Sequence, residues 1–277
     1  MAAKTKKKKY ILEYVMLLVA ILYVYPIFIL ISNSFKTNAD YLKNPYGFPA
    51  KVIFDNITTA VKSIRFFESG FNTLIITVCI VMCLVIFSSM TAYAIVKRSD
   101  RFTKLIYYVI MGGLLIPFQV YMISLVKLLQ QMGIARSPLA LVLSLIAEGT
   151  PLSVFLFSGY LKSIPNELED AAKIDGCGPY TSFFRVVMPL IRPCVAMVVI
   201  FFSLRTWNAF VEPLVIIGNT KFKMLIIQIN NFMSQPYSMK WNLIFAACLL
   251  AMLPIMILFI IMQDKIISGM TSGAVKG

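Results

Sequence analysis

Three ionisable side chains lie inside long apolar runs of this 277-residue sequence. Arg205 and Glu212 belong to the run 193–217, and Glu148 is the one acid in the run 137–161. A charge at membrane depth is costly to desolvate, so such groups mark a functional site by default. Arg205 and Glu212 are seven residues apart, about two helical turns. They therefore share a helix face, but at a separation too long for a direct ion pair.

Polar and aromatic side chains in the apolar runs could offer planar hydrogen-bonding groups and aromatic faces to a polar solute. These side chains are Gln119, Tyr121, Trp207 and Asn208. The alternative is that they brace helices or bridge subunits. Catalysis that depends on histidine is excluded because the sequence contains no histidine. A membrane enzyme is also disfavoured because the sequence offers no convergent pair of acids.

The elements that must position these side chains are membrane helices. The sequence is 59% hydrophobic and 14% charged, whereas about a quarter of the residues in soluble domains are charged. Apolar runs longer than the roughly 20 residues needed to cross hydrocarbon occupy 14–35, 71–96, 105–126, 137–161, 193–217 and 241–263. We therefore predict an all-α, polytopic membrane protein with six transmembrane helices. Gly112, Gly113 and Pro117 should break the third, and residues 36–70 should form a partly structured external loop.

The basic residues predict the orientation of the chain. The net charge is +14, but many Lys and Arg residues flank apolar runs, where they set topology and contact anionic lipid. We therefore expect no nucleic-acid partner. With a cytoplasmic N-terminus, the cytoplasmic segments hold 15 Lys and Arg and the outer segments 10. Both termini are thus predicted to be cytoplasmic. The five cysteines are expected to be small buried side chains rather than metal ligands.

A polar segment at 162–192 separates the fourth and fifth runs. Pro165 and the acids that follow it suit a helix start, and Asn166 and Glu169 have capping-box spacing. Gly176 should end this helix, and a second short helix should follow at 180–187. In that second helix, Phe183, Phe184 and Val187 should pack towards the membrane spans. On this pattern alone, a docking surface for a soluble partner and a solvated helix without a partner both remain open.

The letters of this segment resemble a known motif. Residues 164–176 read IPNELEDAAKIDG and residues 186–190 read VVMPL, which is similar to the EAA motif of binding-protein-dependent ABC importer permeases of the carbohydrate (MalG-like) branch. Asp170 stands where the motif usually has Glu. Further similarities are SFKT at 34–37, NPYGFP at 44–49, WN at 207–208 and the tail from 268 to 277.

The resemblance implies a type I ABC importer permease fold in a bacterial cytoplasmic membrane. The EAA residues would couple to an ATPase subunit; they are Glu167, Glu169, Asp170, Ala171, Ala172, Asp175, Gly176 and Pro189. The implied partners are a second, different permease subunit, two cytoplasmic ATPase subunits, an extracytoplasmic solute-binding protein and membrane lipids. The chain itself would be no enzyme and would bind no cofactor directly, since ATP and magnesium belong to the ATPase subunits.

The predicted organisation is a basic N-terminus with the first helix (1–35), the external loop (36–70), a core permease domain (71–266) that contains the EAA segment, and a cytoplasmic tail (267–277). The resemblance predicts a permease for a sugar or oligosaccharide. A permease of a peptide or amino-acid importer is the alternative within the family. A secondary transporter is a more distant alternative, disfavoured because no internal repeat is evident.

Overall fold

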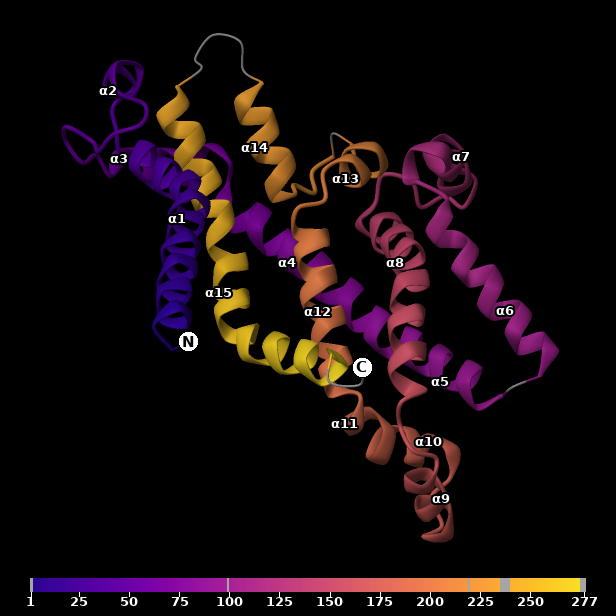
Figure 1. The fold of residues 1–277 in the computed structure, drawn as a ribbon. Coiled ribbons are helices and arrows are strands. Elements are labelled where there is room, and N and C mark those ends of the chain that lie inside the picture. The colour runs from indigo at the N-terminus through magenta and orange to yellow at the C-terminus, as the bar shows by residue number, and fades with distance from the viewer. Residues whose placement is uncertain (1, 99, 219, 235–239, 275–277) are drawn as a thin grey trace. The chain divides into compact units, whose positions relative to one another are not determined.

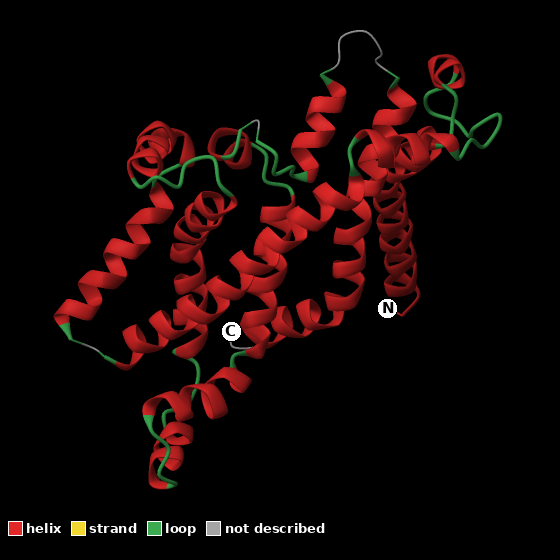
Figure 2. Ribbon diagram, turned by 180° about the vertical axis from the view of Figure 1, so that it is seen from behind, coloured by secondary structure: helices red, strands yellow, loops and turns green. Residues whose placement is uncertain are grey.

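The computed structural model describes residues 2–98, 100–218, 220–234 and 240–274. Within those ranges every regular element is a helix, and no strand occurs (Figures 1 and 2). The chain divides into two compact units, Met1–Phe67 with Gln228–Leu253, and Glu68–Ile227 with Pro254–Gly277. The all-α class predicted from the sequence is confirmed.

Four helical stretches are long and apolar enough to cross a membrane. They are Leu12–Ser34, Phe66–Lys97, Pro138–Leu161 and Trp241–Gln263. Two bent helix pairs raise the number to six if each pair counts as one span. The four continuous stretches coincide closely with four of the predicted runs.

The third predicted span is not straight. Helix α6 (Arg101–Gly112) continues into a short 3-10 turn, η2 (Gly113–Leu115), and α7 (Phe118–Gln131) then leaves at 106°. Ile116 is extended, with φ −102° and ψ 105°, because the ring of Pro117 disfavours a helical residue before it. The predicted break is therefore confirmed, but the chain turns sharply here rather than crossing in one direction.

The fifth predicted span, 193–217, is wrong as a single helix. Helix α12 (Arg192–Trp207) ends in a turn, and α13 (Val211–Ile216) is a separate short helix. At the turn, the side-chain amide of Asn208 donates to the carbonyl of Leu204 at 2.8 Å, which satisfies an acceptor at the helix end. The segment that contains Pro179–Leu190 meets α12 at 76°.

The unit that holds the N-terminal helix is fastened by polar side chains. It contains α1 (Ala2–Ser34), α2 (Asn38–Lys43) and α3 (Asp55–Ser63), with most of α14 (Leu225–Met233) and the start of α15 (Trp241–Ala274). Lys36 is fully buried, and its ammonium donates to the carbonyl of Asn44 at 2.7 Å. Asn56 donates to the carbonyls of Ser34 and Lys36. The predicted external loop is thus partly structured, as expected.

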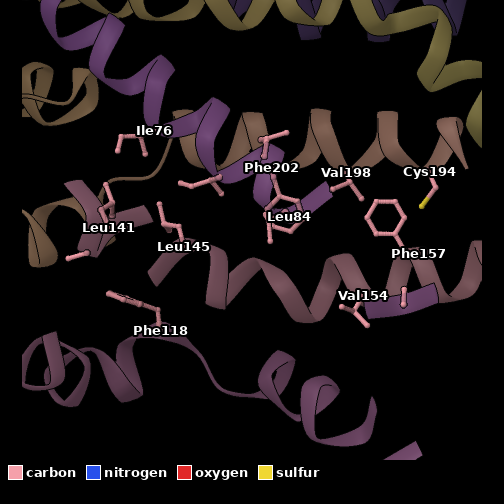
Figure 3. Close-up of a cluster of buried hydrophobic side chains, with 14 of the residues drawn as sticks. Ile76, Leu84, Phe118, Leu141, Leu145, Val154, Phe157, Cys194, Val198 and Phe202 are labelled. Carbon is pink, nitrogen blue, oxygen red and sulfur yellow. The ribbon is translucent and has the colours of Figure 1, made fainter. Parts of the chain in front are cut away.

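The larger unit packs its helices around an apolar core (Figure 3). One long element runs through it, made of α4 (Phe66–Cys83), a π-helical turn η1 (Leu84–Ser88) and α5 (Ser89–Lys97). It packs against α8 (Pro138–Leu161) and α12. Gly149 on α8 allows this approach, because a Cβ there would lie 2.8 Å from side-chain atoms of both Leu84 and Phe202. Small residues allow such close packing between membrane helices.

The cysteines divide by environment. All five are free; Cys194 is buried in the core, Cys83, Cys177 and Cys248 are half-buried, and Cys79 is exposed on α4. The expectation of buried small side chains is therefore met in full at Cys194 and is wrong for Cys79, whose face of α4 points away from the core.

Candidate functional site

Arg205 lies between two carboxylates. Its guanidinium, near the end of α12, donates to the carboxylate of Glu148 on α8. Its Nη2 is also 3.9 Å from Oε1 of Glu212 on α13. The prediction that Arg205 and Glu212 are too far apart to pair is wrong. It assumed one straight helix, whereas the turn at Asn208 folds α13 back and brings Glu212 into range.

This charge cluster, Glu148, Arg205 and Glu212, joins α8, α12 and α13. Its formal charge is −1, and the Arg205 side chain is 35% exposed while the two acids are less exposed. Charges in a low-dielectric setting need partners, and here each acid shares the same guanidinium. Tyr121 lies on α7, which packs against α13. The cluster can therefore hold α13 against the middle of α8 and the end of α12.

The remaining pathway candidates do not converge on this cluster. Gln119 is exposed near the start of α7. Asn208 uses its amide to cap α12. Trp207 is buried and lines a different, apolar hollow of about 470 Å³ between α4, α12 and α15. Of the seven predicted pathway residues, the structure thus brings the three charges together, with Tyr121 on a neighbouring helix, whereas Trp207 lines a separate space.

The polar segment folds as two short helices joined by a glycine turn. Helix α9 spans Glu167–Ile174, and Gly176 has φ +82°, which favours glycine. Helix α10 (Pro179–Ser182), a π-helical turn η3 (Phe183–Val187) and α11 (Met188–Leu190) follow. Both views show α9 and α10 projecting beyond the end of α8 (Figures 1 and 2). The helix, glycine turn and second helix predicted here are confirmed, with half-buried Pro189 near the end of the second.

The inner face of α9 is fastened to α5 by a buried carboxylate. Oε1 of Glu169 forms an ion pair with Lys97 Nζ at 2.6 Å. Its other oxygen, Oε2, accepts a hydrogen bond from the Tyr93 hydroxyl at 2.9 Å. Lys97 Nζ also donates to Asn166 Oδ1 at 2.8 Å. We call these four side chains the α5–α9 clasp.

The clasp corrects the predicted capping box. Asn166 makes no side-chain bond to the α9 backbone, because both it and Glu169 bond to Lys97 instead. Sequence reasoning missed Tyr93 and Lys97, although Lys97 marks the point where an apolar run ends. Glu169 therefore belongs to the inner face of α9.

Apolar side chains are exposed on the outer face of α9 and on α10 and η3, which follow it. Ile174 is 87% exposed, and Leu168, Tyr180 and Phe184 are also exposed. The prediction that Phe184 packs inwards is wrong, because the π-helical turn places Phe183 and Val187, but not Phe184, in the core. Several large apolar groups exposed on one segment indicate an interaction surface.

Acids accompany this apolar surface. Glu167, Asp170, Ala171, Asp175 and Gly176 are exposed, whereas Ala172 is buried. Asp170 pairs with Lys173 at 2.8 Å. The hydrogen bond and the positive charge of Lys173 lower the pKa of Asp170 below its usual value, so this carboxylate stays ionised at a more acidic pH. Leu168, Ala171 and Asp175 thus face solvent, whereas Ala172 between them packs into the core.

Comparison with known proteins identifies a family and relatives of this chain. Residues 84–272 match the family model "Binding-protein-dependent transport system inner membrane component". The chain is 34% identical over 274 residues to the probable starch degradation products transport system permease protein AmyC of Thermoanaerobacterium thermosulfurigenes, covering 99% of both chains. It is 32% identical over 277 residues to the melibiose/raffinose/stachyose import permease protein MelC of Bacillus subtilis, covering 100% of this chain and 99% of that one.

A solved structure has the same fold. The crystal structure of a bacterial ABC transporter involved in the import of the acidic polysaccharide alginate superposes with a TM-score of 0.82 at 20% identity, covering 94% of this chain and 97% of that one. The likeness extends through both compact units of the chain. The family match over most of the sequence and the two relatives that align over the whole chain show its family. The chain belongs to the family of inner membrane components of binding-protein-dependent transport systems.

Proposed function

We propose that this chain is a permease subunit of an ATP-driven importer for a sugar or oligosaccharide. The relatives that align over the full chain are named for the transport of starch degradation products, of melibiose, raffinose and stachyose, and of multiple sugars. In this proposal the larger unit forms half of the translocation pathway, and a second, different permease subunit forms the other half. An extracytoplasmic solute-binding protein delivers the solute.

The driving force would enter through the outer face of α9. One observation carries this assignment. The segment that projects beyond the end of α8 exposes four large apolar side chains, those of Leu168, Ile174, Tyr180 and Phe184. Such a surface, rimmed by Glu167, Asp170 and Asp175, suits a groove with an apolar floor and basic edges. We assign that groove to one of two cytoplasmic ATPase subunits, which would hold ATP and magnesium. The chain itself performs no hydrolysis in this proposal.

A charge on the outer face tests the docking assignment. Ile174→Asp puts a carboxylate at the most exposed apolar position of α9, so the ATPase subunits should no longer co-purify with the permease and solute uptake should stop. Met132→Asp is the matched control, because Met132 is also an exposed apolar residue but lies at the end of α7, outside residues 162–192, which we call the coupling segment. Undiminished ATPase recovery with Ile174→Asp would refute the assignment.

The solute class is tested separately. The solute-binding protein of the same system should retain a sugar or oligosaccharide, and that solute should stimulate ATP hydrolysis by the complete reconstituted complex. Retention of a peptide or amino acid instead would overturn the carbohydrate assignment and leave the docking assignment intact.

A further inference from the structure

A small basic pocket lies where α5 ends, α6 begins and α8 ends. Its volume is about 240 Å³, and its polar lining consists of Arg98, Lys104, Lys162, Ser158, Tyr107 and Tyr108. The α8 end leads directly into the coupling segment, so the pocket is at the same membrane side as α9. Figure 1 shows α5 and α6 meeting at this end.

Three cations line the pocket without a carboxylate to balance them. Among the described residues, no ion pair joins an acid to Arg98, Lys104 or Lys162. The acid nearest in sequence, Asp100, uses both carboxylate oxygens on Thr103, at 2.9 Å from its backbone nitrogen and 2.8 Å from its hydroxyl. Lys97, which precedes Arg98 in the sequence, does have a carboxylate partner, because it forms an ion pair with Glu169. A concentration of positive charge in a concave site favours an anion.

Ser158 supplies a second, independent observation. Its side chain is only 1% exposed and lines the pocket, and its hydroxyl has no hydrogen-bond partner among the described residues. Two other buried serines of α8 behave differently: Ser144 donates to the carbonyl of Ala140 and Ser153 to that of Gly149. A buried hydroxyl without a partner requires an explanation. An oxygen of a bound ligand would satisfy it.

The surroundings identify the ligand. The outer face of α6 exposes Phe102, Leu105, Tyr108 and Val109 next to the pocket, which is surface for acyl chains in a membrane helix. Tyrosines are typical of the interface between headgroups and hydrocarbon. Lys162 Nζ lies 6.0 Å from the centre of the Tyr107 ring, within cation–π range. At about 240 Å³ the pocket is below the usual size of sites for drug-sized ligands, roughly 300–1,000 Å³.

We propose that this basic pocket binds the phosphate headgroup of an anionic phospholipid from the same leaflet. The phosphate oxygens accept from Arg98, Lys104 and Lys162 and from the hydroxyl of Ser158, while the acyl chains lie along α6. Basic pockets between membrane helices bind such headgroups. The bound lipid ties together the ends of three helices, one of which continues into the coupling segment.

Lipid retention by the purified permease in neutral detergent tests the proposal. Native mass spectrometry would compare added phosphatidylglycerol with phosphatidylcholine of the same acyl chains. We expect selective retention of phosphatidylglycerol. Lys104→Ala with Lys162→Ala should reduce it by about tenfold or more, because two of the three cations that line the pocket are then missing. Ser158→Ala, which keeps the charge and the fold, should reduce it several-fold.

Arg101→Ala is the matched control, because Arg101 is exposed at the same end of α6 but does not line the pocket. It should retain phosphatidylglycerol as the unaltered chain does. The proposal is overturned if Arg101→Ala loses as much lipid, or if both lipids are retained equally. It is also overturned if inorganic phosphate alone displaces the lipid at millimolar concentration. Loss of the lipid on assembly with the ATPase subunits would show a protein contact instead.

Discussion

At the scale of single residues, the arginine inside the membrane is already occupied. A sequence reading offers Arg205 as a group that contacts solute, but its guanidinium binds Glu148 and approaches Glu212. The first role that follows from the geometry is to hold α13 against α8. A third of the Arg205 side chain is exposed, so in the proposed pathway a solute hydroxyl would still be able to contact the guanidinium. Release or exchange of one carboxylate would then change both the pathway and the position of α13.

Removal of the shared cation should abolish uptake. Arg205→Ala leaves two carboxylates near each other in a low-dielectric setting, where breaking a buried pair costs about 3–5 kcal/mol and a partly exposed one less. We expect uptake by reconstituted vesicles to be lost while the complex still assembles on gel filtration. Glu148→Gln combined with Arg205→Gln returns the cluster to the formal charge of −1 that it has in the unaltered chain, and should recover stability but not uptake. Normal uptake by Arg205→Ala would show that the cluster has no role in transport.

At the scale of elements, α9 has two faces with different tasks. The inner face is fixed to α5 through Glu169, Lys97 and Tyr93, and the outer face exposes Ile174 and its neighbours. Two π-helical turns, η1 within the α4–α5 element and η3 after α10, flank this connection. Such turns occur frequently at functional sites. A displacement of α9 would therefore pass into α5 through the clasp as well as along the chain.

Loosening the clasp should separate hydrolysis from transport. In Lys97→Ala the carboxylate of Glu169 loses its cation, so we expect solute uptake to fall several-fold per ATP hydrolysed, while the ATPase subunits stay bound. Lys173→Ala is the matched control. It removes a lysine from the exposed pair with Asp170, and exposed pairs contribute little. A double-mutant cycle of Lys97→Ala with Glu169→Ala should give a coupling energy of roughly 0.5–3 kcal/mol. Additive effects would contradict a direct connection.

At the scale of the whole molecule, the transport cycle requires that the coupling segment be cytoplasmic. The distribution of Lys and Arg predicts this orientation, and Cys177 offers a natural reporter in the turn between α9 and α10. It is half-buried, whereas Cys194 is fully buried. A residue on the predicted outer side, Ser234, is exposed after α14 and can carry a second reporter.

Thiol labelling of the full-length permease tests the orientation. In a chain that keeps Cys177 and has alanine at the other four cysteines, a membrane-impermeant maleimide should react in inside-out vesicles and not in right-side-out vesicles. With Cys177 also replaced by alanine, Ser234→Cys should show the reverse. The vesicles should lack the ATPase subunits, which would cover Cys177. An exchanged pattern would invert the predicted topology.

Much of the architecture could be predicted because membrane helices leave a strong one-dimensional signal. An uninterrupted apolar run longer than the bilayer is thick has few structural options. The runs at 137–161 and 241–263 accordingly coincide with helical spans. Gly176 marked the turn after α9 because only a residue without a Cβ adopts φ +82° readily.

By itself, then, the sequence determined the helical class, the position of the four continuous spans and the helix–glycine–helix form of the coupling segment. Tertiary structure alone decided the partners of the charges. The predicted 193–217 helix separated Arg205 from Glu212, but the turn at Asn208 brought them within 3.9 Å. Glu169 was expected to face an ATPase subunit, yet it is buried against Lys97 and Tyr93, 72 and 76 residues earlier. Periodicity describes one helix at a time, whereas an ion pair depends on where a second helix places its side chain.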